Sequence, residues 1–233
     1  MVGGDAMRET RYPTEVITDK ALLLALMHLT ANNNKNILIG DRLKCMKLPF
    51  FAANTMFQDR EKGFNLRFFR DKRGPLSKDV YSAWNHFLIL GLLTENTQGF
   101  EITPKGDALA QVILKNILSN EHNTEFKDIL SSVALKYGKL TTKRIMQIVY
   151  DMEISLPYTD SRAKIRDIAL GEDMIMVLDN DEAKSILEVE PAWLETLAIE
   201  FSPINTQGLA DAFCDYAKGH VLTHEEVWQN VSG

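Results

Sequence analysis

The chain has little cysteine and no long apolar run. Its 233 residues include two cysteines, Cys45 and Cys214, which lie far apart inside helical patterns, so we expect buried thiols rather than a disulfide. The longest apolar stretch, Ala21–Met27, is far shorter than the ~20 residues that a membrane helix needs. The N-terminus also lacks the basic-then-apolar order of a signal peptide. The sequence therefore predicts a cytoplasmic protein that makes no contact with membranes.

Catalytic motifs are also missing. The sequence has no GxSxG, no phosphate-binding loop and no CxxC, so nucleophilic chemistry has no candidate residue. Asp179-x-Asp181 follows an apolar run, as in haloacid-dehalogenase phosphatases, but only 54 residues come after it and no strand–helix alternation is present. His220 and His224 are four residues apart, yet the expected helix cap at Thr223 separates them. We therefore expect no enzymatic activity, no cofactor and no metal site.

Charge is distributed unevenly along a chain whose 45% hydrophobic and 25% charged residues are typical of a soluble globular protein. Residues 1–150 contain 21 Lys and Arg against 15 Asp and Glu, whereas residues 151–233 contain 5 against 17. This asymmetry favours different partners for the two parts, and an undirected drift of surface charge is the alternative. Composition changes at Ser155, so the sequence predicts a domain over residues 1–154 and an acidic helical region over residues 155–233.

Apolar periodicity predicts a mainly α-helical chain. Thr18 is the expected cap of a first helix, and Asp41 is the expected cap of a helix from Arg42 that either runs through or breaks at Pro49. Later helices are expected at 105–118, 125–137, 159–170, 182–187, 191–201 and 207–218, with two more starting after Thr141 and at Thr223. Short strands are expected at 36–38 and 174–178.

The stretch from Phe64 to Gly106 contains the most specific pattern. Phe64–Phe69 alternates like a strand, Gly74-Pro75 forms a turn, and Ser77 is a suitable N-cap for an amphipathic helix. A hairpin with a polar turn and a further helix from Pro104 should follow. Strand, helix, hairpin and helix in this order are typical of a winged helix-turn-helix domain, in which the helix after Ser77 reads DNA and the hairpin is the wing.

Basic and aromatic residues gather around this predicted recognition helix. Seven Lys and Arg lie between Arg60 and Lys78, where they could contact phosphates, and the polar face of the helix could reach base edges. A local excess of about three charges is small beside the roughly six to ten phosphate contacts of strong DNA binders, so a solvated basic loop is the alternative. The candidate DNA-binding residues are Arg67, Arg70, Lys72, Arg73, Lys78, Tyr81, Ser82 and Asn85.

Several of these motifs together resemble the Panacea (SocA-like) domain over roughly residues 19–150. The matching elements are the Arg42–Leu48 helix, the aromatic strand, GPLSxxVY at Gly74–Tyr81, LGLL at 90–93 and FEITPKG at 100–106. Pro49 departs from the pattern, because the corresponding helix normally continues. The family consists of prokaryotic and phage antitoxins and related regulators. The resemblance implies a protein that neutralises a cognate toxin by direct binding and could repress its own operon.

The acidic chain end suggests where such a toxin would bind. Residues 204–233 contain a short amphipathic stretch similar to the ends of many small antitoxins, which cover basic toxins. These residues could instead pack on their own domain. The candidate partner-binding residues are Leu209, Phe213, Tyr216, Val221, Leu222, Val227 and Trp228.

Two functions of different classes remain open from the sequence. The first is an antitoxin-like protein that neutralises a cognate, basic toxin. The second is a winged-helix transcriptional regulator that binds operator DNA, with a C-terminal region that forms a homodimer or senses a ligand.

Overall fold

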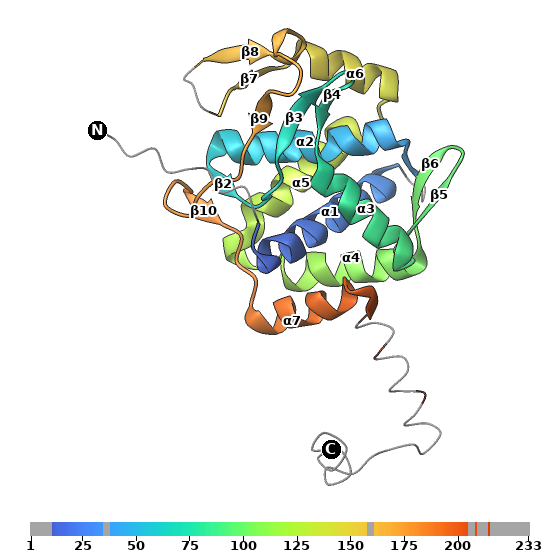
Figure 1. Cartoon of the computed structure of the whole chain (residues 1–233). Helices are drawn as coiled ribbons and strands as arrows, with labels where there is room; N and C mark the ends of the chain where they lie inside the picture. Colours follow the sequence, from blue (N-terminus) through green and yellow to red (C-terminus); the bar gives the residue numbers. More distant parts are fainter. Residues whose placement is uncertain (1–10, 35–37, 158–160, 205–207, 209–213, 215–233) are drawn as a thin grey trace, which may run out of the picture.

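The computed structural model describes residues 11–34, 38–157 and 161–204, together with Gly208 and Cys214. Within these residues the chain is mainly helical, as predicted, with seven α-helices and four small sheets of two or three strands (Figure 1).

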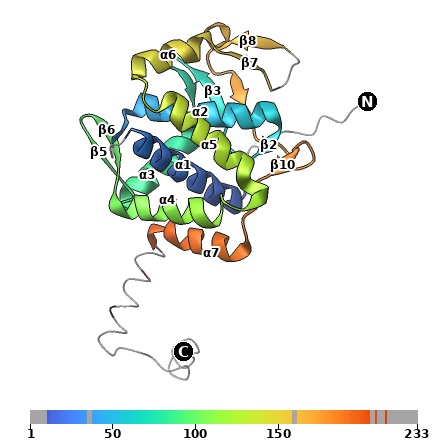
Figure 2. The same ribbon diagram turned by 180° about the vertical axis from the view of Figure 1, so that it is seen from behind.

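Helix α1 (Pro13–Asn33) lies at the centre of the molecule. All its residues from Asp19 to His28 are buried, because apolar side chains occupy most of its circumference. Figures 1 and 2 show the other helices arranged around it, with α5 crossing α1 on the side seen in Figure 2. The helices that contact α1 most extensively are α2 (Arg42–Asp59), α4 (Pro104–Asn116), α5 (Thr124–Tyr137) and α7 (Pro191–Glu200).

The start of α1 differs from the prediction, whereas α2 begins as predicted. Helix α1 starts at Pro13 rather than after Thr18, because proline suits the first helical position and the Glu15 carboxylate accepts a hydrogen bond from the Tyr12 amide at 2.8 Å. The Asp41 side chain caps α2 by accepting from the Lys44 amide at 2.8 Å. Helix α2 continues through Pro49 without ending there.

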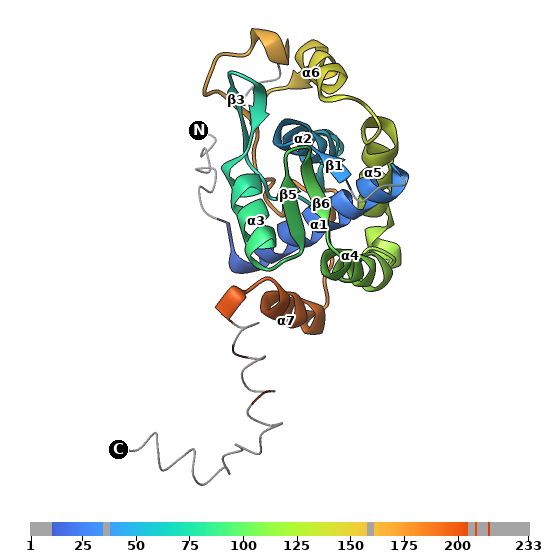
Figure 3. The ribbon, with the colours of Figure 1, turned by 90° about the vertical axis from the view of Figure 1, so that its right-hand side faces the viewer.

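A three-stranded antiparallel sheet, β1-β6-β5, stands at one end of α2. Its strands are β1 (Leu38–Gly40), β5 (Leu93–Asn96) and β6 (Gly99–Ile102). The last two form the expected hairpin, with Asn96 opposite Gly99. Helix α3 (Lys78–Ile89) precedes the hairpin and lies alongside it (Figure 3).

A second sheet, β4-β3-β9, joins the middle of the chain to its later part. It contains β3 (Phe68–Asp71), β4 (Gly74–Leu76) and β9 (Asp173–Ile175). The strand predicted at 64–69 therefore begins four residues later than expected. Strand β3 forms where the backbone can pair with β4 on one side and with β9 on the other. Both partners lie outside residues 64–69, so the apolar alternation of those residues could not reveal where the strand begins.

Two predicted helices in the later part of the chain are wrong. After α6 (Thr142–Asp151), strands β7 (Glu153–Ser155) and β8 (Arg162–Lys164) form a hairpin where a helix was expected from 159. The expected helix at 182–187 is instead strand β10 (Ser185–Ile186), which pairs in parallel with β2 (Glu61–Lys62). Pairing with distant segments overrides the local preference in both places.

The described residues after 154 share their core with the residues before it. Ile165, Met174 and Leu197 belong to the same buried cluster as the residues of α1 and α2. The rings of Phe87 in α3 and Phe201 after α7 lie 5.8 Å apart. The predicted boundary at residue 154 therefore does not separate two hydrophobic cores.

Candidate binding face at helix α3

The amphipathic sequence of α3 leaves one of its faces in solvent. The helix begins where the Ser77 hydroxyl accepts a hydrogen bond from the Val80 amide at 3.5 Å. Val80, Ala83, Trp84 and Phe87 point into the core. Because residues three and four apart share a helix face, the opposite side forms one exposed stripe, which consists of Lys78, Ser82, Asn85 and Ile89. The predicted residue Tyr81 is half-buried at the edge of this stripe, with its ring 5.1 Å from that of Trp84.

The β5–β6 hairpin stands beside α3 (Figure 3). Its turn is built locally, since the Asn96 side-chain oxygen accepts from the amides of Gln98 and Gly99 at 2.8 and 3.1 Å. Its acidic residue Glu95 is held by two 2.6 Å hydrogen bonds from Arg42, which lower the pKa of that carboxyl. The hairpin surface is therefore polar, and the charge of Glu95 is compensated by Arg42.

Two of the predicted basic residues sit at the tip of a second hairpin, β3–β4. Lys72 and Arg73 are exposed there. Beneath the hairpin, the Lys47 ammonium donates a 2.6 Å hydrogen bond to the Pro75 carbonyl and is almost completely buried. Burial lowers the pKa of Lys47 to about 7. The hairpin thus rests on a lysine that the sequence did not single out.

Arg67 and Arg70 are engaged within the molecule. Arg67 pairs with Asp173 at 3.0 Å, and 38% of its side chain remains exposed. Arg70 is buried, its Nε donates to the Ile165 carbonyl at 2.8 Å, and its guanidinium lies over the Tyr150 ring. Of the five predicted basic residues, Lys72, Arg73 and Lys78 therefore offer the more exposed charges, while Arg70 serves packing.

A hollow of about 480 Å³ opens at the first turn of α3. Its lining includes charged residues of both signs and two uncharged ones, and consists of Arg67, Lys78, Asp79, Asp173, Phe69 and Gly171. Asp173 and Gly171 come from the later part of the chain, so the sequence pattern around residues 64–106 could not reveal them.

Arg11 connects this hollow to the core of the molecule. Its guanidinium donates to Asp79 at 2.6 Å and to Asp19 at 2.7 Å, and so links α3 to α1. Asp19 is almost completely buried and also accepts from the Asn65 amide at 2.7 Å. Burial raises the pKa of Asp19 to about 7, against the opposing effect of Arg11.

The predicted partner-binding site near the end of the sequence lies outside the residues that the structure describes. The candidate partner-binding residues Leu209, Phe213, Tyr216, Val221, Leu222, Val227 and Trp228 are all outside the described residues. Within the described ranges, no group of three or more His, Cys, Asp and Glu side chains is arranged to hold a metal ion. No helix in those ranges is both long and apolar enough to span a bilayer.

Comparisons of the chain with models of protein families, with curated proteins and with solved structures found no match. Its function is therefore inferred from the geometry described above and from the motif residues of the sequence.

Proposed function

We propose that the protein is an antitoxin-like protein that neutralises a cognate toxin by direct protein–protein binding. The observation that carries this proposal is that the motif residues of the Panacea resemblance have defined structural roles. Gly74 adopts the positive φ of +85° in the β3–β4 hairpin, and Ser77 and Thr103 cap α3 and α4. Gly106 lies where a Cβ atom would come within 2.1 Å of the Leu92 carbonyl oxygen. Residues in these roles mark a shared fold more strongly than surface residues would.

The arrangement of the elements supports a winged helix as the fold of the first part. The order α1, β1, α2, α3, β5, β6, with β1 pairing to the hairpin strand β6, matches that architecture, and the β3–β4 hairpin is an addition between α2 and α3. We assign the exposed stripe of α3 and the neighbouring β5–β6 hairpin as its binding face.

Charge supports a basic toxin as the partner. Residues 151–233 carry 5 Lys and Arg against 17 Asp and Glu, which favours rapid association with a positively charged protein. Neutralisation would be steric or allosteric and would need no chemistry by this chain.

The test is rescue of growth when the chain is co-expressed with the product of the adjacent reading frame. Deletion of residues 204–233, or Trp228→Ala, should abolish rescue, because a buried aromatic anchor commonly dominates such interfaces. The neighbouring change Gln229→Ala is the matched control and should retain rescue. Full rescue by the deleted chain would remove the tail from the mechanism, and an adjacent product without toxicity would contradict the antitoxin proposal.

A second candidate function, repression of an operator, is favoured by the polar stripe of α3 beside the hairpin. Here Lys78, Ser82 and Asn85 would face the major groove, and Lys72 and Arg73 would contact phosphates.

The double change Arg73→Ala and Lys78→Ala tests the operator hypothesis. Operator affinity should fall, because Lys78 loses a base contact, and the slope of log K against log salt should decrease in magnitude by about 1, because Arg73 loses a phosphate contact. The control is Lys115→Ala with Lys136→Ala, which makes the same change of charge at exposed positions on α4 and α5. An equal effect of both double variants would indicate a general charge effect and argue against contact through α3.

A further inference from the structure

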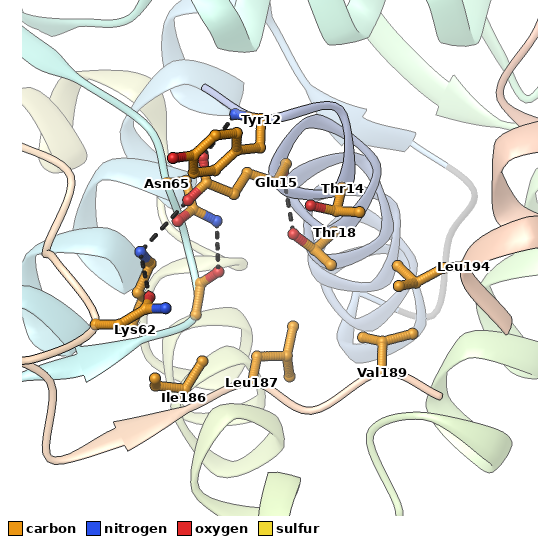
Figure 4. A pocket seen from close by; sticks show the side chains of 12 residues that line it. Tyr12, Thr14, Glu15, Thr18, Lys62, Asn65, Ile186, Leu187, Val189 and Leu194 are labelled. Atoms are coloured by element: carbon orange, nitrogen blue, oxygen red, sulfur yellow. Dashed lines mark hydrogen bonds and ion pairs between the residues drawn. The ribbon is translucent and has the colours of Figure 1, made fainter. Parts of the chain in front are cut away.

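A pocket of about 240 Å³ lies where the first turn of α1 meets the later part of the chain. The segments that form it are this turn, strand β2, the parallel strand β10 and the start of α7 (Figures 1 and 4). A cavity of about 150 Å³ is large enough for a benzene ring. The pocket therefore has room for one large side chain of a partner protein.

One wall of the pocket is apolar and reaches the molecular surface. Figure 4 shows Ile186, Leu187 and Val189 along this wall, with Leu194 beside them. Ile186 is 40% exposed, and Tyr12, which lines the pocket from the start of α1, is 59% exposed. Large apolar and aromatic side chains that remain in contact with water around a hollow are typical of protein-binding sites.

The polar wall on the other side has its charges paired internally. The Lys62 ammonium lies 3.4 Å from a Glu15 carboxylate oxygen, and these side chains are only 7% and 12% exposed. The same ammonium donates to the Asn180 side-chain oxygen at 2.8 Å. An ionised group that entered the pocket would lose its hydration without gaining a free opposite charge, so the pocket suits an uncharged side chain.

Acidic residues adjoin the pocket in the later part of the chain. Four lining residues have an exposed acidic neighbour in the sequence, at a Cα–Cα distance of about 3.8 Å. The four are Asn180, Leu187, Val189 and Leu194, and the acidic neighbours are Asp181, Glu188, Glu190 and Glu195. Within the ranges that the structure describes, none of these four carboxylates forms an ion pair.

The wider segment around these residues has the same sign of charge. Residues 179–200 contain seven Asp and Glu against one Lys. The surface beside the pocket is therefore strongly negative, and its carboxylates are available to the cations of a partner. A partner with negative charge, such as a nucleic acid, would be repelled from it.

We propose that this pocket is a docking site for a positively charged protein, which inserts one large apolar side chain while its Lys and Arg residues pair with the adjoining carboxylates. The inserted side chain supplies most of the affinity, and the outer charges speed association and exclude acidic partners. The assignment of the toxin as this basic partner rests on the proposed function. The pocket then provides a contact for the toxin within the described residues, in addition to residues 204–233.

The experiment uses the full-length chain and a peptide probe, acetylated and amidated Lys-Lys-Phe-Lys-Lys, with binding followed by ligand-observed NMR. At low salt the peptide should bind with a Kd on the order of 0.1 mM. Replacing its Phe by Ala should weaken binding about 10-fold or more, because the buried ring is lost. Replacing its four Lys by Glu should weaken binding by at least about 10-fold, because like charges then meet.

A variant that fills the pocket locates the binding. Leu194→Trp should weaken binding of the Phe peptide about 10-fold or more and leave binding of the Ala peptide unchanged. Leu135→Trp adds the same bulk at an exposed position on α5 and should bind both peptides like the unmodified chain. If Leu194→Trp does not fold, Val189→Trp, from the segment before α7, takes its place.

A charge variant tests the acidic surroundings. Glu188→Gln with Glu195→Gln should weaken binding of the Phe peptide by about 5-fold or more at low salt. Glu153→Gln with Asp167→Asn makes the same change of charge at exposed positions outside the pocket and should have a much smaller effect. Equal effects of the two pairs would reduce the attraction to net charge and overturn the role of the carboxylates.

The docking site and the proposed function fail on different observations. Equal binding of the Phe and Ala peptides, or unchanged Phe-peptide binding in the pocket-filling variant, would overturn the docking site. An adjacent reading frame without a toxic product would overturn the proposed function but leave the peptide results intact. With a toxin identified, Leu194→Trp should weaken its binding about 10-fold or more, and unaltered toxin binding would overturn the toxin as the occupant.

Discussion

Lys47 is a lysine in an environment unusual for its residue type. Its side chain is 2% exposed, and its ammonium bonds to the Pro75 carbonyl beneath the β3–β4 hairpin. Burial is the main cause that lowers its pKa from 10.5 to about 7, with Asp71 acting in the opposite direction. The folded state therefore holds fewer protons than the unfolded state between these two pH values, so folding stability should increase as the pH rises from 7 to 10.5.

We expect Lys47→Met to be more stable than the unmodified chain at about pH 6, by on the order of 2 kcal/mol, because the buried charge is removed while the side-chain length is kept. The advantage should shrink or reverse by about pH 10, where Lys47 is neutral and its hydrogen bond to Pro75 remains. Urea unfolding at both pH values measures the difference. Lys115→Met, at an exposed lysine of α4, is the control, and a pH-independent gain from Lys47→Met would contradict the expectation.

Gly106→Ala should destabilise the protein even though alanine is the better helix former. The added Cβ would lie 2.1 Å from the Leu92 carbonyl oxygen, so α4 and the start of β5 would have to separate. We expect a loss of about 2–4 kcal/mol in the free energy of unfolding, as for overpacked core positions.

The matched control for Gly106→Ala is Gly91→Asn. Gly91 has a φ of +66°, but a Cβ atom at this position would meet no other atom within 4 Å, and asparagine tolerates that conformation. Its cost should stay below about 1 kcal/mol. Equal melting temperatures for the two variants would show that the close approach at Gly106 does not constrain the fold.

At the residue scale, a role that depends on neighbours in the sequence could be predicted, whereas a role that depends on a partner far along the chain could not. Asp41, Ser77 and Thr103 cap the expected helices, because a cap bonds an amide three residues away. Arg70 was expected on a DNA-binding surface, but its partner Ile165 is 95 residues distant, and no pattern around Arg70 reports that contact.

At the scale of elements, the ion pairs of Arg11 and Arg42 play different parts. Arg11 joins α1 to the first turn of α3 through Asp19 and Asp79, and its Asp19 partner is buried. Arg42 joins α2 to the β5–β6 hairpin through Glu95, and both side chains are partly exposed. Buried pairs are costly to break from one side, whereas exposed pairs contribute little.

Arg11→Gln should therefore cost about 2–3 kcal/mol of stability and speed hydrogen exchange at the first amides of α3. Arg42→Gln removes the same charge and should cost less than about 1 kcal/mol. Hydrogen exchange measured by mass spectrometry distinguishes the two variants, because only Arg11→Gln should speed exchange in residues 78–82. Unaltered exchange there would mean that Arg11 does not hold α3.

Helices were more predictable than strands at this scale. The sequence placed α5, α7 and the starts of α3 and α6 to within a residue or two, since caps, prolines and apolar spacing are signals contained in the helix itself. The segments of strands β8 and β10 were expected to be helical. Each strand has only two or three residues and forms by pairing with β7 or β2, so the local sequence contains no signal for it.

At the scale of the whole molecule, the later part of the chain completes the core of the earlier part. A chain truncated after residue 154 would lose strand β9, which pairs with the edge of β3, and the ring of Phe201, which packs against Phe87. We expect it to lose a cooperative thermal transition and to bind a hydrophobic dye, because the uncovered surface includes the face of α1 that meets α7. Circular dichroism during heating is the measurement. A sharp transition at the temperature of the full-length chain would show that residues 1–154 fold independently.

The domain boundary at residue 154 was inferred from charge and composition, which describe surfaces. The packing of β9, β10 and α7 depends on a few apolar residues, such as Met174, Leu197 and Phe201, that leave the net charge unchanged. The hollow beside α3 was unpredictable for the same reason, because Asp173 reaches it only through the pairing of β9 with β3.

The contact between α1 and α7 also has a consequence for synthesis on the ribosome. Helix α1 is made first, yet α7, which covers part of it, follows after roughly 160 further residues. At ~5–20 residues per second, roughly 8–32 s pass between the two. During that interval the leucines of α1 lack their last partner, so the nascent chain offers a binding site to chaperones until α7 has been made.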